Sequence, residues 1–216
     1  MVHNFSQNNS YINQIVYELR HVDIQKDRAK FRNNLEKFGI LAGYELSRDL
    51  HYSAEEVQTT LGSTIIETLD DSVVIISILR AGIPLQYGLL KLLDTAETGF
   101  IAAYRKEHPG GGFDIKMDYI TCPDLSNKVV IFTDPMLATG SSLNTAMKMI
   151  ENYGEPKELH LVSVIASEFA VEQIKRLHPS IKMWVGAIDE ELTAKSYIVP
   201  GLGDAGDLAY GEKLQG

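Results

Sequence analysis

Residues 134–142, DPMLATGSS, combine a carboxylate with small and hydroxyl-bearing side chains. They follow the apolar run KVVIF and precede LNTAMKMIENYG, which has helical spacing. Free backbone N–H groups and the positive end of the dipole at a helix start attract phosphate. Thr139, Ser141 and Ser142 would add hydroxyl donors, and Gly140 would allow close backbone approach. The spacing predicts a phosphate site, although a capped helix with Asp134 as an ordinary turn residue would also explain it.

The carboxylate narrows the choice of ligand. A P-loop is excluded, because the loop lacks the required Gly-Lys-Ser/Thr ending. Asp134 would repel a bare phosphate, but a carboxylate accepts hydrogen bonds from hydroxyl groups. A sugar phosphate such as ribose 5-phosphate has hydroxyls beside its phosphate, and we expect a ligand of this kind.

Two arginines follow other apolar runs. Arg80 ends the run in ISILRAGIP, and Arg105 stands in AAYRKEHPGGG. A guanidinium group suits a diphosphate, because its planar fork donates two hydrogen bonds and stays charged. Arg80 taken alone could also be a surface residue at a strand end. The glycines at 110–112 predict a lid within the loop 105–128 that closes over a ligand.

A glycine-rich stretch, YIVPGLGDAGDLAYG, lies near the end of the chain. Its residues 201–206 satisfy G-x-G-x-x-G, but only ten residues follow Gly206. A dinucleotide site needs a helix, a second strand and an acid about twenty residues further on. We therefore reject a dinucleotide site, and a plain terminal loop is the alternative to a different ligand-binding role.

The remaining sequence predicts the scaffold of these loops. Near-continuous apolar runs, typical of strands buried on both faces, occupy residues 73–79, 100–104, 129–132, 159–166 and 181–188. Helical segments are expected from Pro84, over 143–150 with Gly154 closing it, and after Ser167 as a cap. Their alternation predicts a mostly parallel sheet flanked by helices, with ligands bound beyond the carboxyl ends of the strands.

Composition limits the classes of function. The 216 residues are 44% hydrophobic and 23% charged, which fits one globular domain over 1–216. A net charge of -9 argues against a nucleic-acid or membrane partner. The single cysteine, the polar first residues and the short apolar runs predict a cytoplasmic protein without an intrachain disulfide.

Taken together, the motifs resemble those of type I phosphoribosyltransferases, in the form found in the uracil phosphoribosyltransferase family. VVIFTDPMLATGSS resembles the phosphoribosyl pyrophosphate signature, and ILRAG and the segment around Arg105 resemble pyrophosphate contacts. YIVPGLGDAGD is similar to the uracil loop over its whole length. Ser141 and Leu208 depart from the usual pattern, whereas Thr133 replaces a second acid common in other branches. The resemblance implies the type I α/β fold with a small C-terminal hood.

The same resemblance implies the roles of individual residues. Asp134 would hold ribose hydroxyls while the following loop wraps the 5-phosphate. Backbone groups of Ile198, Gly203 and Ala205 would read uracil, with Asp204 beside them facing the sugar. Asp134, Asp204 and Arg105 are the expected catalytic residues. The expected phosphoribosyl pyrophosphate site consists of Arg80, Arg105, Asp134, Pro135, Met136, Leu137, Ala138, Thr139, Gly140, Ser141, Ser142 and Asp204.

The implied reaction converts uracil and phosphoribosyl pyrophosphate into UMP and pyrophosphate, a step of pyrimidine salvage. Mg²⁺ is the expected cofactor, carried by pyrophosphate without an assigned protein ligand, and a homodimer or larger homo-oligomer is expected. Two alternatives are a transferase for a purine base and an RNA-binding regulator on the same fold. An aromatic stacking residue and a lysine in the base loop would favour a purine, and its glycine-rich part has neither. An RNA-binding face would need a basic stripe, which the net charge of -9 opposes.

Other conspicuous residues are interpreted as structural rather than functional. We expect His108, His160 and His178 on the surface, because their spacing does not suit a metal. Met183 and Trp184 are expected in the core or an interface. The acidic stretch at 189–191, DEE, is expected to be a solvated turn.

Overall fold

The computed structural model describes residues 1–107 and 113–213, and all their side chains except those of 103–107 and 113–118. Its centre is an eight-stranded sheet of order β1-β10-β9-β7-β4-β5-β6, with β8 paired to β9. The pairings are parallel except that of β5 with β6. The strands are β1 (Val2–Asn4), β4 (Val73–Leu79), β5 (Glu97–Glu107), β6 (Phe113–Thr121), β7 (Val129–Thr133), β8 (Met136–Leu137), β9 (Glu158–Ser167) and β10 (Lys182–Asp189).

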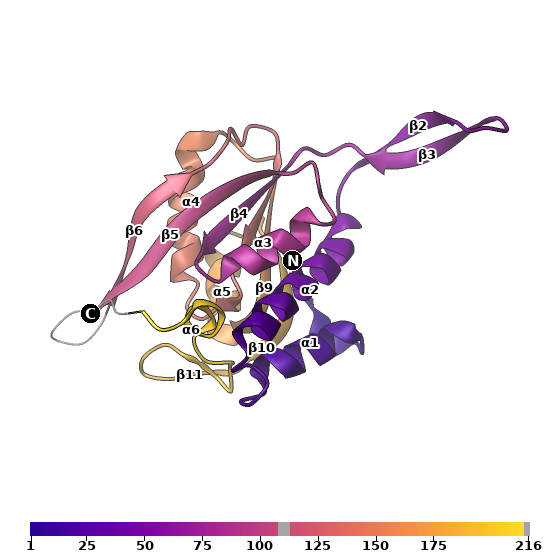
Figure 1. Cartoon of the computed structure of the whole chain (residues 1–216). Helices are drawn as coiled ribbons and strands as arrows, with labels where there is room; N and C mark the ends of the chain where they lie inside the picture. Colours follow the sequence, from indigo (N-terminus) through magenta and orange to yellow (C-terminus); the bar gives the residue numbers. More distant parts are fainter. Residues whose placement is uncertain (108–112, 214–216) are drawn as a thin grey trace.

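Helices cover both faces of this sheet (Figure 1). On one face, α1 (Tyr11–Arg20), α2 (Arg28–Ser47) and α3 (Gly82–Leu90) share a core with one set of strand side chains. On the other, α4 (Ser141–Ile150) and α5 (Glu168–Leu177) pack against the opposite set. Val73 and Ile75 belong to the first core, and Val74 and Ile76 belong to the second. Burial on both faces explains why the central strands are almost wholly apolar.

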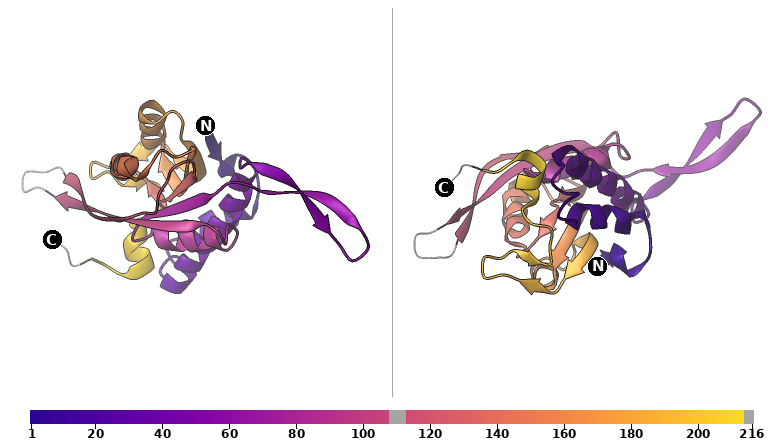
Figure 2. Two further views of the ribbon diagram at one scale, coloured as in Figure 1. Left: turned by 90° about the horizontal axis from the view of Figure 1, so that it is seen from above. Right: turned by 60° about the horizontal axis from the view of Figure 1, so that its bottom comes forward.

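Smaller elements complete the chain. The antiparallel strands β2 (Tyr52–Gln58) and β3 (Ser63–Leu69) form a hairpin that projects from the body (Figures 1 and 2). Near the C-terminus, β11 (Glu191–Leu192) pairs with β12 (Ile198–Val199), and α6 (Ala205–Tyr210) follows. Two 3₁₀ turns, η1 (Phe5–Gln7) and η2 (Glu151–Tyr153), join neighbouring elements. No helix in the described part of the chain is long and apolar enough to cross a bilayer.

The expected α/β architecture is confirmed, as are the strands predicted from the five apolar runs. Ser167 caps α5, because its hydroxyl accepts from the Ala170 N–H at 2.9 Å. The helix expected from Pro84 begins two residues earlier, at Gly82. The expected lid region is largely a strand pair, since β5 extends to Glu107 and β6 occupies Phe113–Thr121. Residues 108–112, which include His108 and the three glycines, lie outside the described residues.

Two histidines expected on the surface are placed differently. His160 is fully buried, and its Nδ1 accepts from the Trp184 indole N–H at 3.0 Å. Burial, which disfavours the charged ring, lowers the pKa of His160 to about 4. His178 is half-buried, with its Nε2 2.9 Å from Asn144 Oδ1. Met183 and Trp184 lie in the core, as expected.

Candidate functional site

The end of β7 joins two neighbouring elements at the carboxyl edge of the sheet. The hydroxyl of Thr133 donates to the Gly82 carbonyl at 3.1 Å, which ties β7 to the start of α3. The backbone N–H of Asp134 donates to the Val162 carbonyl of β9 at 3.2 Å. The Asp134 carboxylate accepts from the Met136 N–H at 3.2 Å. The position of Asp134 is therefore fixed from both sides of its strand.

The loop after Asp134 is held by hydrogen bonds where it turns into α4. The Pro135 carbonyl accepts from two N–H groups of β9, at 3.2 and 3.1 Å. Ser167 donates from its hydroxyl to the Ala138 carbonyl at 2.6 Å. Gly140 has a left-handed φ of 74°, and a Cβ there would lie 3.1 Å from the Ile174 side chain. Both the backbone conformation and the close helix packing explain the glycine.

Hydroxyl groups gather where this loop enters the helix. Thr139 Oγ1 lies 2.8 Å from Ser141 Oγ, and Ser141 and Ser142 are the first two residues of α4. The first N–H groups of an α-helix have no partner within the helix and can bind an anion. In this structure the Ser141 N–H makes a long hydrogen bond of 3.4 Å to Thr139 Oγ1. Ser141, one of the residues that depart from the resembled pattern, keeps its hydroxyl in this cluster. The geometry suits a phosphate dianion.

Arg80 reaches from the end of β4 to the C-terminal segment. Its Nη2 donates to Asp207 Oδ1 at 2.9 Å and to the Gly211 carbonyl at 3.2 Å. Its Nε is buried without an acceptor among the described residues. A Cβ on Gly206 would lie 3.3 Å from Arg80 Nη2, so the start of α6 lies directly against the guanidinium group. Arg80 thus adjoins the glycine-rich loop.

The glycine-rich loop follows β12. Gly201 and Gly203 have left-handed φ values of 61° and 96°. Asp204 caps α6, because its carboxylate accepts from the Asp207 N–H at 3.0 Å. The Ala205 N–H donates to Met136 Sδ at 3.4 Å. This contact brings the glycine-rich loop against the phosphate loop, so that the two predicted halves of the site meet.

The remaining residues singled out from the sequence lie in different environments. Ile198 is buried in β12, whereas Gly203 is exposed. Arg105 lies in β5 opposite Ile115, but its side chain is outside the described residues. The Gly201–Gly206 pattern is followed by α6 and by no strand among the described residues, so a dinucleotide fold is absent there. Leu208 packs against the apolar core.

Several polar residues of this region escaped sequence reasoning. Asp207 stands inside the quoted glycine-rich motif, but nothing there predicts that it pairs with Arg80. Lys213 lies 3.4 Å from Asp204 Oδ2. Asp189, expected in a solvated turn, is instead 8% exposed and is paired with Arg20. That expectation was wrong because the partner of Asp189 comes from the other end of the chain, where local acidity gives no signal.

Comparisons with known proteins identify the family of the chain. The family model described as uracil phosphoribosyltransferase matches residues 6–212. A uracil phosphoribosyltransferase of Porphyromonas gingivalis is 47% identical over 206 residues, covering 95% of each chain. One from Pyrococcus furiosus is 40% identical, covering 97% of this chain and 90% of the relative. A solved structure from Aquifex aeolicus superposes with a TM-score of 0.88 at 30% identity, covering all of both chains.

The pairing of Arg80 with Asp207 generates a prediction about anion binding. Asp207→Asn should tighten the binding of inorganic pyrophosphate by about threefold to tenfold, because it removes a carboxylate that competes for the guanidinium group. Titration calorimetry of the parent and the variant checks this. Glu212→Gln, on the same segment but exposed, is the control and should change nothing. Weaker binding in Asp207→Asn would mean that Asp207 holds Arg80 ready for the anion.

Proposed function

The chain belongs to the uracil phosphoribosyltransferase family, and we propose that its carboxyl-edge loops join uracil to phosphoribosyl pyrophosphate, giving UMP and pyrophosphate. The observation that carries this proposal is the meeting of three loops. The Ala205 N–H lies 3.4 Å from Met136 Sδ, and Arg80 lies 2.9 Å from Asp207. A base loop, a sugar-phosphate loop and a pyrophosphate-binding arginine are thus within reach of one substrate pair. The two loops and the arginine can therefore act on one reaction centre.

The sugar phosphate is assigned to the loop after β7. Asp134 would accept hydrogen bonds from the ribose hydroxyls, as an ionised carboxylate can accept several. Residues 135–142 would enclose the 5-phosphate with N–H groups of the α4 start and the hydroxyls of Thr139, Ser141 and Ser142. The bonds from β9 and Ser167 support this assignment, because they fix the loop before any ligand arrives. A preformed cradle loses little entropy on binding.

Pyrophosphate is the proposed leaving group. Arg80 and Arg105 would donate to its oxygens and stabilise the charge that develops as it departs. Mg²⁺ would neutralise part of that charge when bound to the diphosphate oxygens and water. Among the described residues, no group of three or more His, Cys, Asp or Glu side chains could hold a metal ion. The donors assigned to the two phosphate groups are hydroxyls and N–H groups of the loop after β7 together with Arg80 and Arg105, and a donor set of this kind fits an ion brought by the diphosphate.

The chemical step is a displacement at the anomeric carbon. The uracil N1 would form its bond to that carbon as the carbon–oxygen bond to pyrophosphate breaks, with inversion and an oxocarbenium-like transition state. Most of the rate enhancement then comes from orientation and charge stabilisation. Asp204 is the candidate acceptor of the proton lost from N1, because its carboxylate caps α6 between the base loop and Arg80.

Uracil would be recognised by backbone groups of the glycine-rich loop. The N–H groups of Gly203 and Ala205 would donate to the two carbonyl oxygens, and the Ile198 carbonyl would accept from the ring N–H. In the ligand-free chain the Ala205 N–H donates to a thioether sulfur, a weak acceptor. Exchanging that sulfur for a carbonyl oxygen strengthens the hydrogen bond. Family membership favours this base over a purine and favours catalysis over RNA binding.

We propose further that the chain acts in pyrimidine salvage in the cytoplasm and forms a homodimer or a larger homo-oligomer. The hairpin of β2 and β3 supports self-association. Leu61 at its tip is 98% exposed and Ile65 is 71% exposed. Covering apolar side chains on a projecting hairpin with a partner surface lowers the free energy of the oligomer.

The first test addresses base choice. With phosphoribosyl pyrophosphate and Mg²⁺, the chain should form UMP from uracil and should accept 5-fluorouracil, which presents the same edge. Cytosine exchanges one acceptor for a donor and the ring donor for an acceptor. Leaving buried backbone groups unpaired should make its kcat/KM lower by about 10⁴ or more. Comparable kcat/KM values for cytosine and uracil would contradict recognition by the backbone.

Asp134→Asn tests the sugar site. The amide keeps the shape but loses the charge, so activity should fall by about tenfold or more while the melting temperature stays close to that of the parent. Steady-state kinetics with both substrates give the measurement. Asp94→Asn, at an exposed position in the loop after α3, is the matched control. If the two variants had the same activity, Asp134 would have no part in binding ribose.

Self-association is tested on the hairpin. The double change Leu61→Ser and Ile65→Thr should shift the chain towards monomers in sedimentation experiments at micromolar concentration, because it removes exposed apolar surface from the proposed contact. Val22→Thr, at a position 61% exposed on the body of the molecule, is the control. An oligomer of unchanged size in the double variant would place the interface elsewhere.

A further inference from the structure

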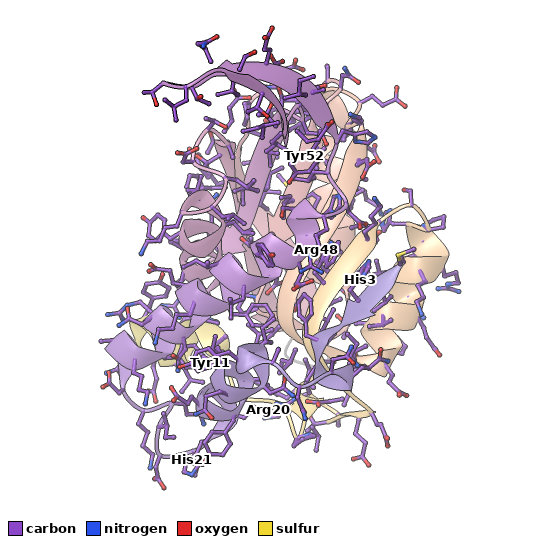
Figure 3. The ribbon with its side chains drawn as sticks, turned by 90° about the vertical axis from the view of Figure 1, so that its right-hand side faces the viewer. His3, Tyr11, Arg20, His21, Arg48 and Tyr52 are labelled. Atoms are coloured by element: carbon purple, nitrogen blue, oxygen red, sulfur yellow. The ribbon has the colours of Figure 1, made fainter. Side chains whose placement is uncertain are left out.

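An ion pair joins the first helix to the end of β10, beside the base loop. Arg20, the last residue of α1, donates from Nη1 to Asp189 Oδ2 at 2.8 Å and from Nη2 to Oδ1 at 2.7 Å. The side chains of Arg20 and Asp189 are only 21% and 8% exposed. Figure 3 shows Arg20 beside the pale yellow ribbon of the C-terminal segment. A two-point, largely desolvated pair of this kind has a well-defined geometry.

The same two side chains hold both polar backbone groups of Gly201. Asp189 Oδ2 accepts from the Gly201 N–H at 3.0 Å, and Arg20 Nη1 donates to the Gly201 carbonyl at 3.2 Å. Gly201 in turn lies against Ile198, since a Cβ at Gly201 would be 2.1 Å from the Ile198 carbonyl oxygen. That oxygen is the proposed acceptor for the uracil ring N–H. The pair therefore contacts Gly201, and Gly201 contacts the carbonyl group proposed to read the base.

A third side chain from the N-terminal region contacts the next residue of the loop. In the orientation that satisfies both atoms of its amide, Gln25 donates to the Leu202 carbonyl at 2.8 Å and to the Leu19 carbonyl at 2.9 Å. Backbone groups of Gly201 and Leu202 are thus bound by side chains, whereas the following Gly203 is exposed. The bound groups anchor the start of the loop, and the next residues are the ones proposed to read uracil.

We infer that Arg20 and Asp189 are positioning residues for uracil, which fix the base loop through Gly201 so that its backbone groups match the edge of the base. The inference rests on the proposed function. Because the reading groups are backbone atoms, no loop side chain can adjust them, and their geometry depends on what holds the loop. The sugar-phosphate loop has its own supports in β9 and Ser167, although it also meets the base loop in the contact of Ala205 with Met136. Loss of the Arg20–Asp189 pair should therefore raise the KM for uracil much more than the KM for phosphoribosyl pyrophosphate.

The test compares the two Michaelis constants. In Asp189→Asn and in Arg20→Gln, the KM for uracil should rise by about tenfold or more, because a buried charge is left without its partner and the loop shifts. The KM for phosphoribosyl pyrophosphate should stay within about twofold. Arg20→Lys keeps the charge but loses the planar fork, so its uracil KM should be intermediate. Arg48→Gln, at an exposed arginine paired with Glu45, is the control and should match the parent.

Thermal melting of each variant shows whether its kinetic change comes from a displaced base loop or from a loss of folded protein. A merely structural pair would lower the yield of folded enzyme and the apparent kcat, with both KM values unchanged, and that result would overturn the inference. An equal rise in both KM values would overturn it as well. If Asp189→Asn does not fold, the uracil KM of Arg20→Lys decides the question. A parent chain that forms no UMP would refute the proposed function, whereas an active parent with unchanged uracil KM in the variants would refute the positioning role alone.

Discussion

Burial of the central strands on both faces determines where this protein can do chemistry. Side chains of β4 and β7 point alternately into two apolar cores, so neither face of these strands is open to a ligand. Polar groups inside the sheet, such as His160 of β9, are buried, and polar groups that can meet a ligand therefore lie where the strands end. Because neighbouring strands are parallel, their carboxyl ends meet at one edge, and the hydrogen bond from Thr133 to Gly82 locks two of the resulting loops together. Asp134 and Arg80 follow from that arrangement.

Two cationic groups at this edge lie beside carboxylates of the protein. Arg80 is paired with Asp207, and Lys213 lies near Asp204. In the proposed function, a diphosphate that binds Arg80 would exchange with the carboxylate of Asp207, which lies in α6 next to the glycine-rich loop. Binding of phosphoribosyl pyrophosphate would then change contacts of the segment proposed to read uracil. A net charge of -9 does not oppose this, because the cationic groups are local and directed.

Sequence patterns predicted the parts of this structure that depend on short-range rules. The central strands followed from continuous apolar runs, and the cap at Ser167 followed from its position before an amphipathic segment. β1 was missed because its Val2–Asn4 stretch is short and is stabilised by pairing with β10, far away in the chain. His160 and Asp189 were misjudged for the same reason, since Trp184 and Arg20 satisfy them across the fold. The roles of the phosphate and base loops came from resemblance, because composition alone does not identify a ligand.

The distance along the sequence between Arg20 and its partners has a consequence for folding during synthesis. Arg20 and Asp189 are 169 positions apart, and Arg20 and Gly201 are 181 apart. During translation the N-terminal part of a chain is made first, and contacts between distant positions close last. A nascent chain that has emerged as far as α5 already contains Asp134 and the whole loop to which we assign the sugar phosphate. It still lacks every residue that we propose to read the base, so in the proposed function selectivity for uracil is the last property to be completed.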